Sequence, residues 1–168
     1  MRIHELLEVA ATPFPMDRVK PANPPKYGAA VIPMQPFQQA KQVNAQRMQA
    51  QQALDPFTES YITAALWSSM GDDGEPLDSQ YGVDDLADET LMKMVHDCQE
   101  FQKTYAHLYQ EVGMDDEQAG HDFWLTREGH GAGFWDRNLG QIGDELNKAA
   151  KSYGGFDLYV GDDGKIYG

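Results

Sequence analysis

The chain has 168 residues, enough for about one domain, and 41% of them are hydrophobic, slightly fewer than in an average globular protein. It contains no apolar run of about 18 residues, so no membrane-spanning helix is predicted. Cys98 is the single cysteine, which excludes an intrachain disulfide and a cysteine-based zinc site and makes a reducing cytoplasm the default place of synthesis.

Charge divides the chain into two parts. Residues 1–54 contain six Lys or Arg and three Asp or Glu, a net charge of +3. Residues 55–168 contain seven Lys or Arg and 24 Asp or Glu, a net charge of −17. An acidic domain repels phosphate groups, so we expect no direct binding of nucleic acid. Two interpretations of the charge stay open: it attracts a basic protein surface or cations, or it only keeps the domain soluble.

A proline-rich arm occupies residues 1–36 and holds seven of the nine prolines. Because proline fixes φ and lacks a backbone donor, the arm is predicted to be extended and unable to build a core. Its isolated apolar residues suit a strap that inserts small anchors into a partner's grooves, and the alternative is a disordered tail. The candidate partner-binding residues are Ile3, Leu6, Leu7, Phe14, Val31, Ile32 and Phe37.

Residues 37–54 are predicted to form a spacer helix between the arm and the domain. They are rich in Gln and Ala and contain no Gly or Pro, so their helix propensity is high. Their apolar residues form no continuous stripe, which indicates a solvent-exposed helix. A partner helix along the Ala-rich side is the alternative.

The acidic domain is predicted to span residues 55–168. It begins with a helix, because Asp55 is a good N-cap and Pro56 suits the first helical position. Residues 71–82 have the composition of a loop, and residues 85–112 form a long helix in which Cys98 is interpreted as a small buried hydrophobe. The apolar stripe of that helix consists of Leu91, Met94, Cys98, Phe101, Tyr105, Leu108 and Val112.

Two further helices are predicted, over residues 115–125 and 138–152, with a glycine-rich loop between them. Alternating apolar residues around residues 161–164 predict a C-terminal β-hairpin, which must pack against helices because two strands alone are marginal. The predicted fold is therefore mainly α with a small C-terminal β-hairpin (α+β), preceded by the extended arm and the spacer helix.

Residues 120–137, GHDFWLTREGHGAGFWDR, carry the densest set of chemically active side chains and show no helical or strand period. We interpret this segment as a recognition or catalytic loop that the rest of the domain holds in place. Its candidate residues are His121, Asp122, Trp124, Arg127, His130, Trp135, Asp136 and Arg137.

Each group in this segment also has a structural interpretation. Its two His and two Asp lack the spacing of a strong zinc motif, so they form a metal site only if the loop gathers them; otherwise they bond the glycine-rich backbone. The two Trp either pack in the core or line a ligand pocket. Arg127 and Arg137 either pair with the surrounding acids or hold an anionic group.

So much aromatic area does not stay exposed in water. We therefore expect residues 120–137 to fold back onto the helix of residues 85–112, with at least one Trp buried. We also expect His121 or His130 to bond within the segment or to a neighbouring carboxylate. The sequence GDDG at residues 71–74 and 161–164 lacks the acid spacing of a calcium loop, so both copies are interpreted as turns. No established catalytic or cofactor motif occurs, and the sequence predicts no cofactor and favours a role other than catalysis.

The acidic domain resembles a small acidic domain of uncharacterised tailed-bacteriophage proteins. The resemblance covers about residues 55–168, rests mainly on the HDFWLTR-x-GHGAGFWDR segment and does not include the arm. That family has no established activity, so the resemblance implies a phage origin and transfers no catalytic residue. The similar stretches are FTESYITAALWSS, DDGEPLDSQYGVDDLADETL, AGHDFWLTREGHGAGFWDR and FDLYVGDDGKIY.

Three hypotheses of function follow. The first is a bacteriophage virion-associated structural or accessory protein, made in the host cytoplasm and present in multiple copies, whose arm straps onto other virion subunits. The second is an acidic cytoplasmic inhibitor that mimics nucleic acid toward a basic host protein. The third is a small metal-assisted hydrolase or lyase centred on His121, His130 and Asp136. We expect no membrane partner and favour the first hypothesis, because isolated anchors lie on a proline-rich arm whose charge is opposite to that of the domain.

Overall fold

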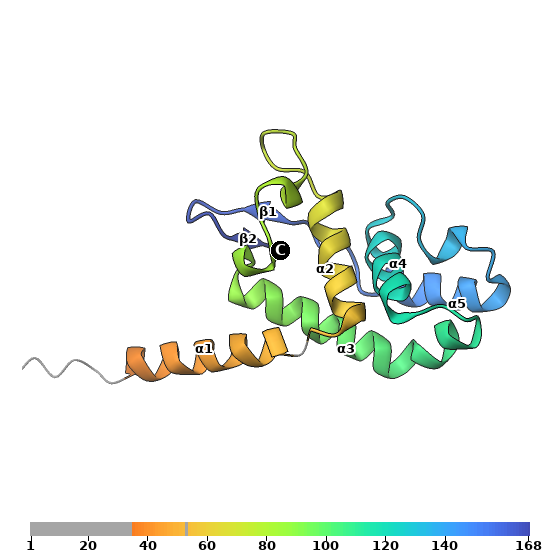
Figure 1. Cartoon of the computed structure of the whole chain (residues 1–168), viewed down its shortest axis with the longest axis horizontal. Helices are drawn as coiled ribbons and strands as arrows, with labels where there is room; N and C mark the ends of the chain where they lie inside the picture. The colour runs from red at the N-terminus through yellow and green to blue at the C-terminus, as the bar shows by residue number, and fades with distance from the viewer. Residues whose placement is uncertain (1–34, 53) are drawn as a thin grey trace, which may run out of the picture. The chain divides into compact units, whose positions relative to one another are not determined.

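The computed structural model describes residues 35–52 and 54–168, and the chain divides into two units, residues 1–33 and 34–168. The second unit confirms the predicted fold class: it is mainly helical, with a two-stranded antiparallel hairpin at the C-terminus (Figure 1). None of the described helices has both the length and the hydropathy to cross a membrane. The elements are α1 (Gln35–Gln52), α2 (Pro56–Ser68), α3 (Asp88–Glu111), α4 (Asp116–Glu128), α5 (Gly140–Lys151), the 3-10 helices η1 (Leu77–Ser79), η2 (Val83–Asp85) and η3 (Phe134–Asp136), and the strands β1 (Tyr159–Val160) and β2 (Ile166–Tyr167).

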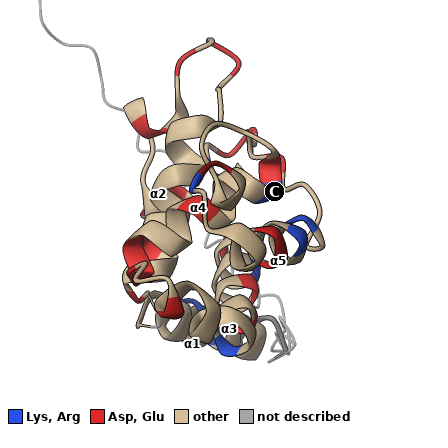
Figure 2. Cartoon of the chain, turned by 90° about the vertical axis from the view of Figure 1, so that its right-hand side faces the viewer, with Lys and Arg blue, Asp and Glu red and all other residues tan. Residues whose placement is uncertain are grey.

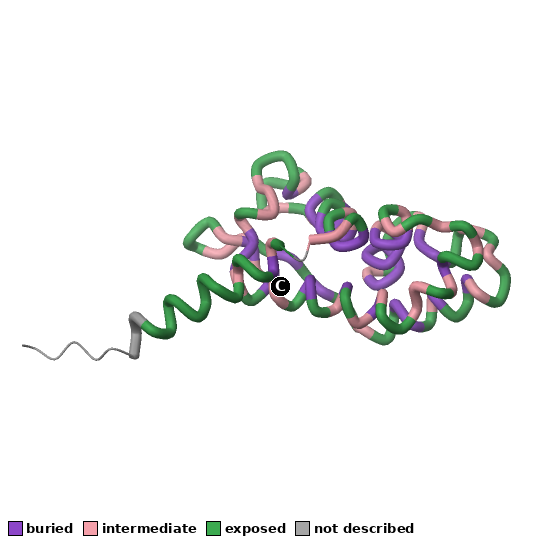
Figure 3. Tube along the Cα trace, turned by 60° about the horizontal axis from the view of Figure 1, so that its bottom comes forward, coloured by how far each residue is buried: buried purple, intermediate pink, exposed green. Residues whose placement is uncertain are grey.

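The predicted spacer helix is present as α1 and is exposed over most of its length (Figure 3). Near its C-terminal end, Ala50 is buried. The Arg47 guanidinium donates hydrogen bonds to the carbonyl oxygens of Leu86 and Asp84, at 3.0 Å each, and to the Asp88 carboxylate. One arginine therefore joins α1 to the segment that leads into α3.

Helices α2 and α4 pack against each other in the core. α2 begins as predicted, with Pro56 as its first residue and Asp55 Oδ1 accepting a hydrogen bond from the Thr58 backbone N–H at 2.8 Å. The helices approach closely because Gly120 of α4 has no side chain. A Cβ at that position would clash with the carbonyl oxygen of Phe57.

Helix α3 confirms the long apolar stripe. It starts at Asp88 and not at residue 85, because residues 83–85 form η2. Burial raises the pKa of the Cys98 thiol well above its usual range, so this cysteine is a core residue and not a nucleophile. Leu91, Met94, Cys98 and Phe101 are buried, and Tyr105, Leu108 and Val112 are half-buried.

The first half of the predicted recognition loop is a core helix, which corrects the sequence interpretation. α4 continues beyond the predicted end at residue 125 to Glu128, and every residue from Asp122 to Arg127 is buried. A helix enclosed on all sides needs no polar face, so its sequence shows no amphipathic period. The loop itself is confined to residues 129–133, between α4 and η3.

The C-terminal hairpin forms as predicted, with Tyr159 opposite Tyr167 and Val160 opposite Ile166. Ile166 is fully buried, and its carbonyl oxygen accepts a hydrogen bond from the Ala87 backbone N–H at 2.8 Å. The hairpin thus packs at the start of α3, which provides the support that two strands need.

Candidate functional site

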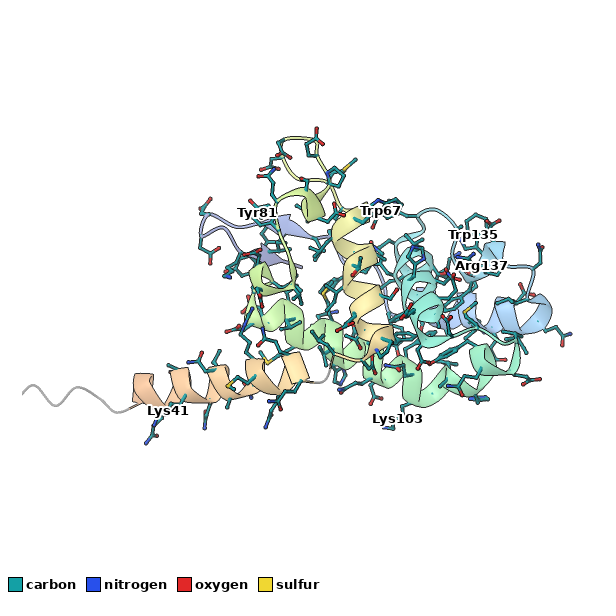
Figure 4. All side chains as sticks on the ribbon, in the orientation of Figure 1. Lys41, Trp67, Tyr81, Lys103, Trp135 and Arg137 are labelled. Carbon is teal, nitrogen blue, oxygen red and sulfur yellow. The ribbon has the colours of Figure 1, made fainter. Side chains whose placement is uncertain are left out.

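Asp122 is a fully buried carboxylate that holds the end of residues 120–137 against α4 (Figure 4 labels its partner, Arg137). Arg137 donates Nε and Nη2 to the two carboxylate oxygens at 2.8 Å each, and Gln118 donates Nε2 at 2.8 Å. The hydrogen bonds to Asp122 raise the pKa of Arg137. His121 Nδ1 lies 3.3 Å from the same carboxylate, which confirms the expected contact of a histidine with a carboxylate.

Arg127 joins α4 to three other parts of the fold. Its guanidinium donates to the Tyr61 hydroxyl at 2.7 Å, to the Asp97 carboxylate at 2.9 Å, and to the carbonyl oxygens of Gly154 and Tyr153 at 2.6 and 3.2 Å. Desolvation lowers the pKa of this group, but Tyr61 and Asp97 outweigh it and the pKa is raised. Both arginines of the segment therefore pair with groups of the protein, and neither guanidinium is free to bind an anionic ligand through two parallel hydrogen bonds.

The aromatic side chains of the segment divide into a buried and an exposed part. Trp124 is 1% exposed and donates Nε1 to Ser68 Oγ at 2.7 Å, so one Trp is buried as expected. Phe123 stacks on Phe101 of α3 with ring centroids 4.1 Å apart. The segment thus contacts α3 as predicted, but α4 packs most extensively on α2. Trp135 is 54% exposed and lies outside the core.

The His and Asp side chains of the segment do not converge. His130 follows the Gly129 C-cap of α4 and Asp136 lies in η3, and both are exposed. Within residues 35–52 and 54–168, no three His, Cys, Asp or Glu side chains are grouped so that they could hold a metal ion. Of the eight candidates in the segment, His130, Trp135 and Asp136 are exposed, and His121 and Arg137 are partly exposed, so these five side chains are accessible from solvent.

The candidate anchors of the arm up to Ile32 lie outside the described residues, and so does the side chain of Phe37. The structure instead reveals a groove of about 370 Å³ beside α2, which we call the α2 groove. Its walls come from two stretches of chain, residues 54–66 and 78–83, so no single sequence motif marks it. Its floor is apolar, Leu54, Ile62, Leu66 and Val83, and its rim carries the carboxylates of Glu59 and Asp78.

A second surface feature is a pair of matching turns formed by the two GDDG sequences. In each, the last glycine donates its N–H to the carbonyl of the first, at 3.0 Å in residues 71–74 and 2.9 Å in residues 161–164. The backbone N–H of the following residue donates to Asp73 or Asp163 at 3.1 Å in both turns, and these hydrogen bonds lower the pKa of the two carboxyls. Both turns line one cavity of about 340 Å³. The turns confirm the sequence interpretation and place exposed carboxylates close together.

Comparison of the chain with known protein families, curated proteins and solved structures finds no match. The geometry itself defines the class of protein. This is a small helical domain whose buried charged side chains serve as internal ties. Its described surface offers an apolar groove, an acidic pair of turns and an exposed helix.

Proposed function

We propose that this chain is a bacteriophage virion-associated accessory protein that binds other virion subunits through residues 1–34 and α1. The observation that carries the proposal is the exposure of α1. Val43 and Met48 are 37% and 61% exposed.

The energetics of α1 support a partner. In proteins, most of the stability of a helix comes from packing an apolar face and not from helix propensity alone. α1 packs little of its length on its own domain and has no apolar stripe of its own. Binding to another subunit would supply the missing contacts.

Charge supports the same conclusion. Residues 18–54 contain five Lys or Arg and no Asp or Glu, while the domain that follows carries −17 (Figure 2 shows how the acidic residues are spread over it). Such a basic stretch is attracted to an acidic protein surface and is repelled by the same basic stretch of other copies. The internal pairing of Arg127 and Arg137 argues against residues 120–137 as a catalytic centre.

The test uses the phage that encodes this chain. Its gene is replaced by a variant that lacks residues 1–34, and the copy number in purified particles is measured by mass spectrometry. The truncated chain should be folded in the lysate and missing from particles, whereas Gln141→Ala, on the exposed side of α5, should be present at the normal copy number. Normal incorporation of the truncated chain would disprove the proposal.

An acidic inhibitor of a basic host protein is the second candidate, and the paired acidic turns favour it. The exposed carboxylates of Asp72, Asp73, Glu75 and Asp162 line one cavity. If this function holds, the purified chain should displace a host DNA-binding protein from DNA at low salt, and Asp72→Asn combined with Asp162→Asn should weaken the displacement. No displacement at low salt would rule this candidate out.

A further inference from the structure

The α2 groove has the character of a binding site for an extended apolar segment. Its floor is apolar, Ile62 and Leu66 are buried beneath it, and its volume of about 370 Å³ lies within the range of about 300–1,000 Å³ that ligand pockets span. The carboxylates of Glu59 and Asp78 at the rim favour an occupant that carries Lys or Arg next to its apolar residues.

The chain itself contains a segment of this chemistry. Residues 27–33, YGAAVIP, are apolar and end in proline, and Lys20 and Lys26 precede them in a stretch without any acidic residue. Proline reduces the conformational entropy that an extended segment loses on binding, which favours docking of such a segment into a groove.

Covalent geometry decides which copy provides the segment. Leu54 of the groove follows the C-terminal end of α1, and Ile32 precedes its N-terminal end at Gln35. The 18 residues of α1 span about 26 Å at about 1.5 Å per residue, and α1 still rises about 18 Å from Gln35 to Arg47, which bonds Asp84 beside the Val83 wall of the groove. The three residues from Ile32 to Gln35 reach at most about 11 Å, so with α1 intact the Ile32 of the same chain does not reach the groove.

We propose that residues 27–33 of one copy bind in the α2 groove of a second copy, with Val31 and Ile32 on its apolar floor. The contact joins two different surfaces, so it links copies head to tail into a ring or a filament. Charge favours this arrangement, because it places the acid-free residues 18–34 of one copy against the acidic domain of the next. A symmetric contact between two arms would instead bring like charges together. The inference rests on the proposed role of the arm as a docking segment.

Disulfide trapping tests the contact. Thr63 lines the groove and is exposed, so protein carrying Ile32→Cys is mixed with protein carrying Thr63→Cys and oxidised. The native Cys98 is buried and does not interfere. A covalent dimer of the two variants is expected at low salt, with several-fold less at about 0.5 M NaCl, where screening is strong. The matched control is Ile32→Cys mixed with Gln141→Cys, an exposed position on α5, which should give no more than background dimer.

Three outcomes would overturn the inference. The first is equal dimer formation with Gln141→Cys. The second is an intramolecular disulfide, without doubling of mass, in a chain that carries both Ile32→Cys and Thr63→Cys. The third is a full-length chain that stays monomeric at all concentrations in light scattering and is not changed by Ile32→Asp.

One further measurement separates this inference from the proposed function. Ile32→Asp lies in the arm and leaves the core residues unchanged, so its thermal midpoint should match that of the wild type while self-association is lost. If the wild-type chain never self-associates but removal of residues 1–34 still abolishes incorporation into particles, the head-to-tail contact is wrong and the virion role stands. If self-association is trapped but particles never contain the protein, the head-to-tail contact stands and the virion role is wrong.

Discussion

Asp122 and Arg127 are the charged residues that the described part of the chain buries, and each is neutralised by a specific partner. Removing one partner of a buried pair leaves an uncompensated charge, which typically costs about 3–5 kcal/mol. At the scale of single residues, the main role of the buried charged groups of residues 120–137 is therefore to stabilise the fold.

Trp124 and Trp135 should differ sharply in their contribution to stability. Trp124→Ala removes a fully buried ring and its hydrogen bond to Ser68, so the free energy of unfolding should fall by about 3–5 kcal/mol. Trp135→Ala, at an exposed position, should change it by less than about 0.5 kcal/mol. Urea midpoints of the two variants measure this difference, and equal midpoints would contradict the packing described above.

Gly120→Ala should destabilise the protein although alanine is the better helix former. The gain in helix propensity is about 1 kcal/mol, but the new Cβ clashes with the Phe57 backbone, and overpacking of this kind typically costs about 1–3 kcal/mol or more. Gly155→Ala is the matched control, because a Cβ there meets only Glu128, at 3.9 Å. Thermal midpoints of both variants check the prediction, which fails if Gly120→Ala is as stable as the control.

Glu128 should make stability fall as pH rises. Burial raises the pKa of this carboxyl above its ordinary value of 4.5, although the hydrogen bond from the Phe156 N–H opposes the shift. The folded state then binds the proton more tightly than the unfolded state, so stability is lost as pH rises from 4.5 through the raised pKa.

Glu128→Gln removes this titration and keeps an acceptor for the Phe156 N–H. The free energy of unfolding of the variant minus that of the wild type should therefore increase from about pH 4 to about pH 7, as measured by urea unfolding. A difference that stays constant or decreases over this range would show that the carboxyl is not penalised in the fold.

At the scale of elements, α1 is exposed over most of its length, and the Arg47 side chain joins it to residues 84–88 by three hydrogen bonds. Arg47→Ala should detach the helix and speed hydrogen exchange over residues 38–50, while exchange in α3 stays unchanged. Met48→Ala, at an exposed position on the same helix, is the control and should leave exchange unaltered. Slow exchange of α1 in the Arg47 variant would show that other contacts hold the helix.

At the scale of the whole molecule, the net charge of −14 acts against compaction, because like charges in the folded domain repel one another. Raising the salt concentration from about 20 mM to about 300 mM should therefore raise the thermal midpoint, since screening weakens this repulsion. Sodium and choline chloride at equal ionic strength should act alike, because screening does not depend on the cation. A midpoint that falls, or that rises with sodium alone, would contradict this explanation.

The sequence by itself determined the parts whose physics is local. Asp55 and Pro56 mark the start of a helix through backbone capping, the stripe from Leu91 to Val112 marks α3, and the turn at residues 161–164 marks the hairpin. The charge division between residues 1–54 and 55–168 also needs no structure. Each of these depends on neighbouring residues or on composition, so the chain order alone carries the information.

Tertiary structure alone decided the nature of residues 120–137 and of the surface. α4 has no period because α2, α3 and α5 enclose it, and the sequence could not show which of Trp124 and Trp135 is covered by other elements. The sequence could not show the partners of Arg127 and Arg137 either, since acidic residues are abundant throughout residues 55–168. The α2 groove brings residues 54–66 together with residues 78–83, and a surface shared by two segments exists only once the chain has folded.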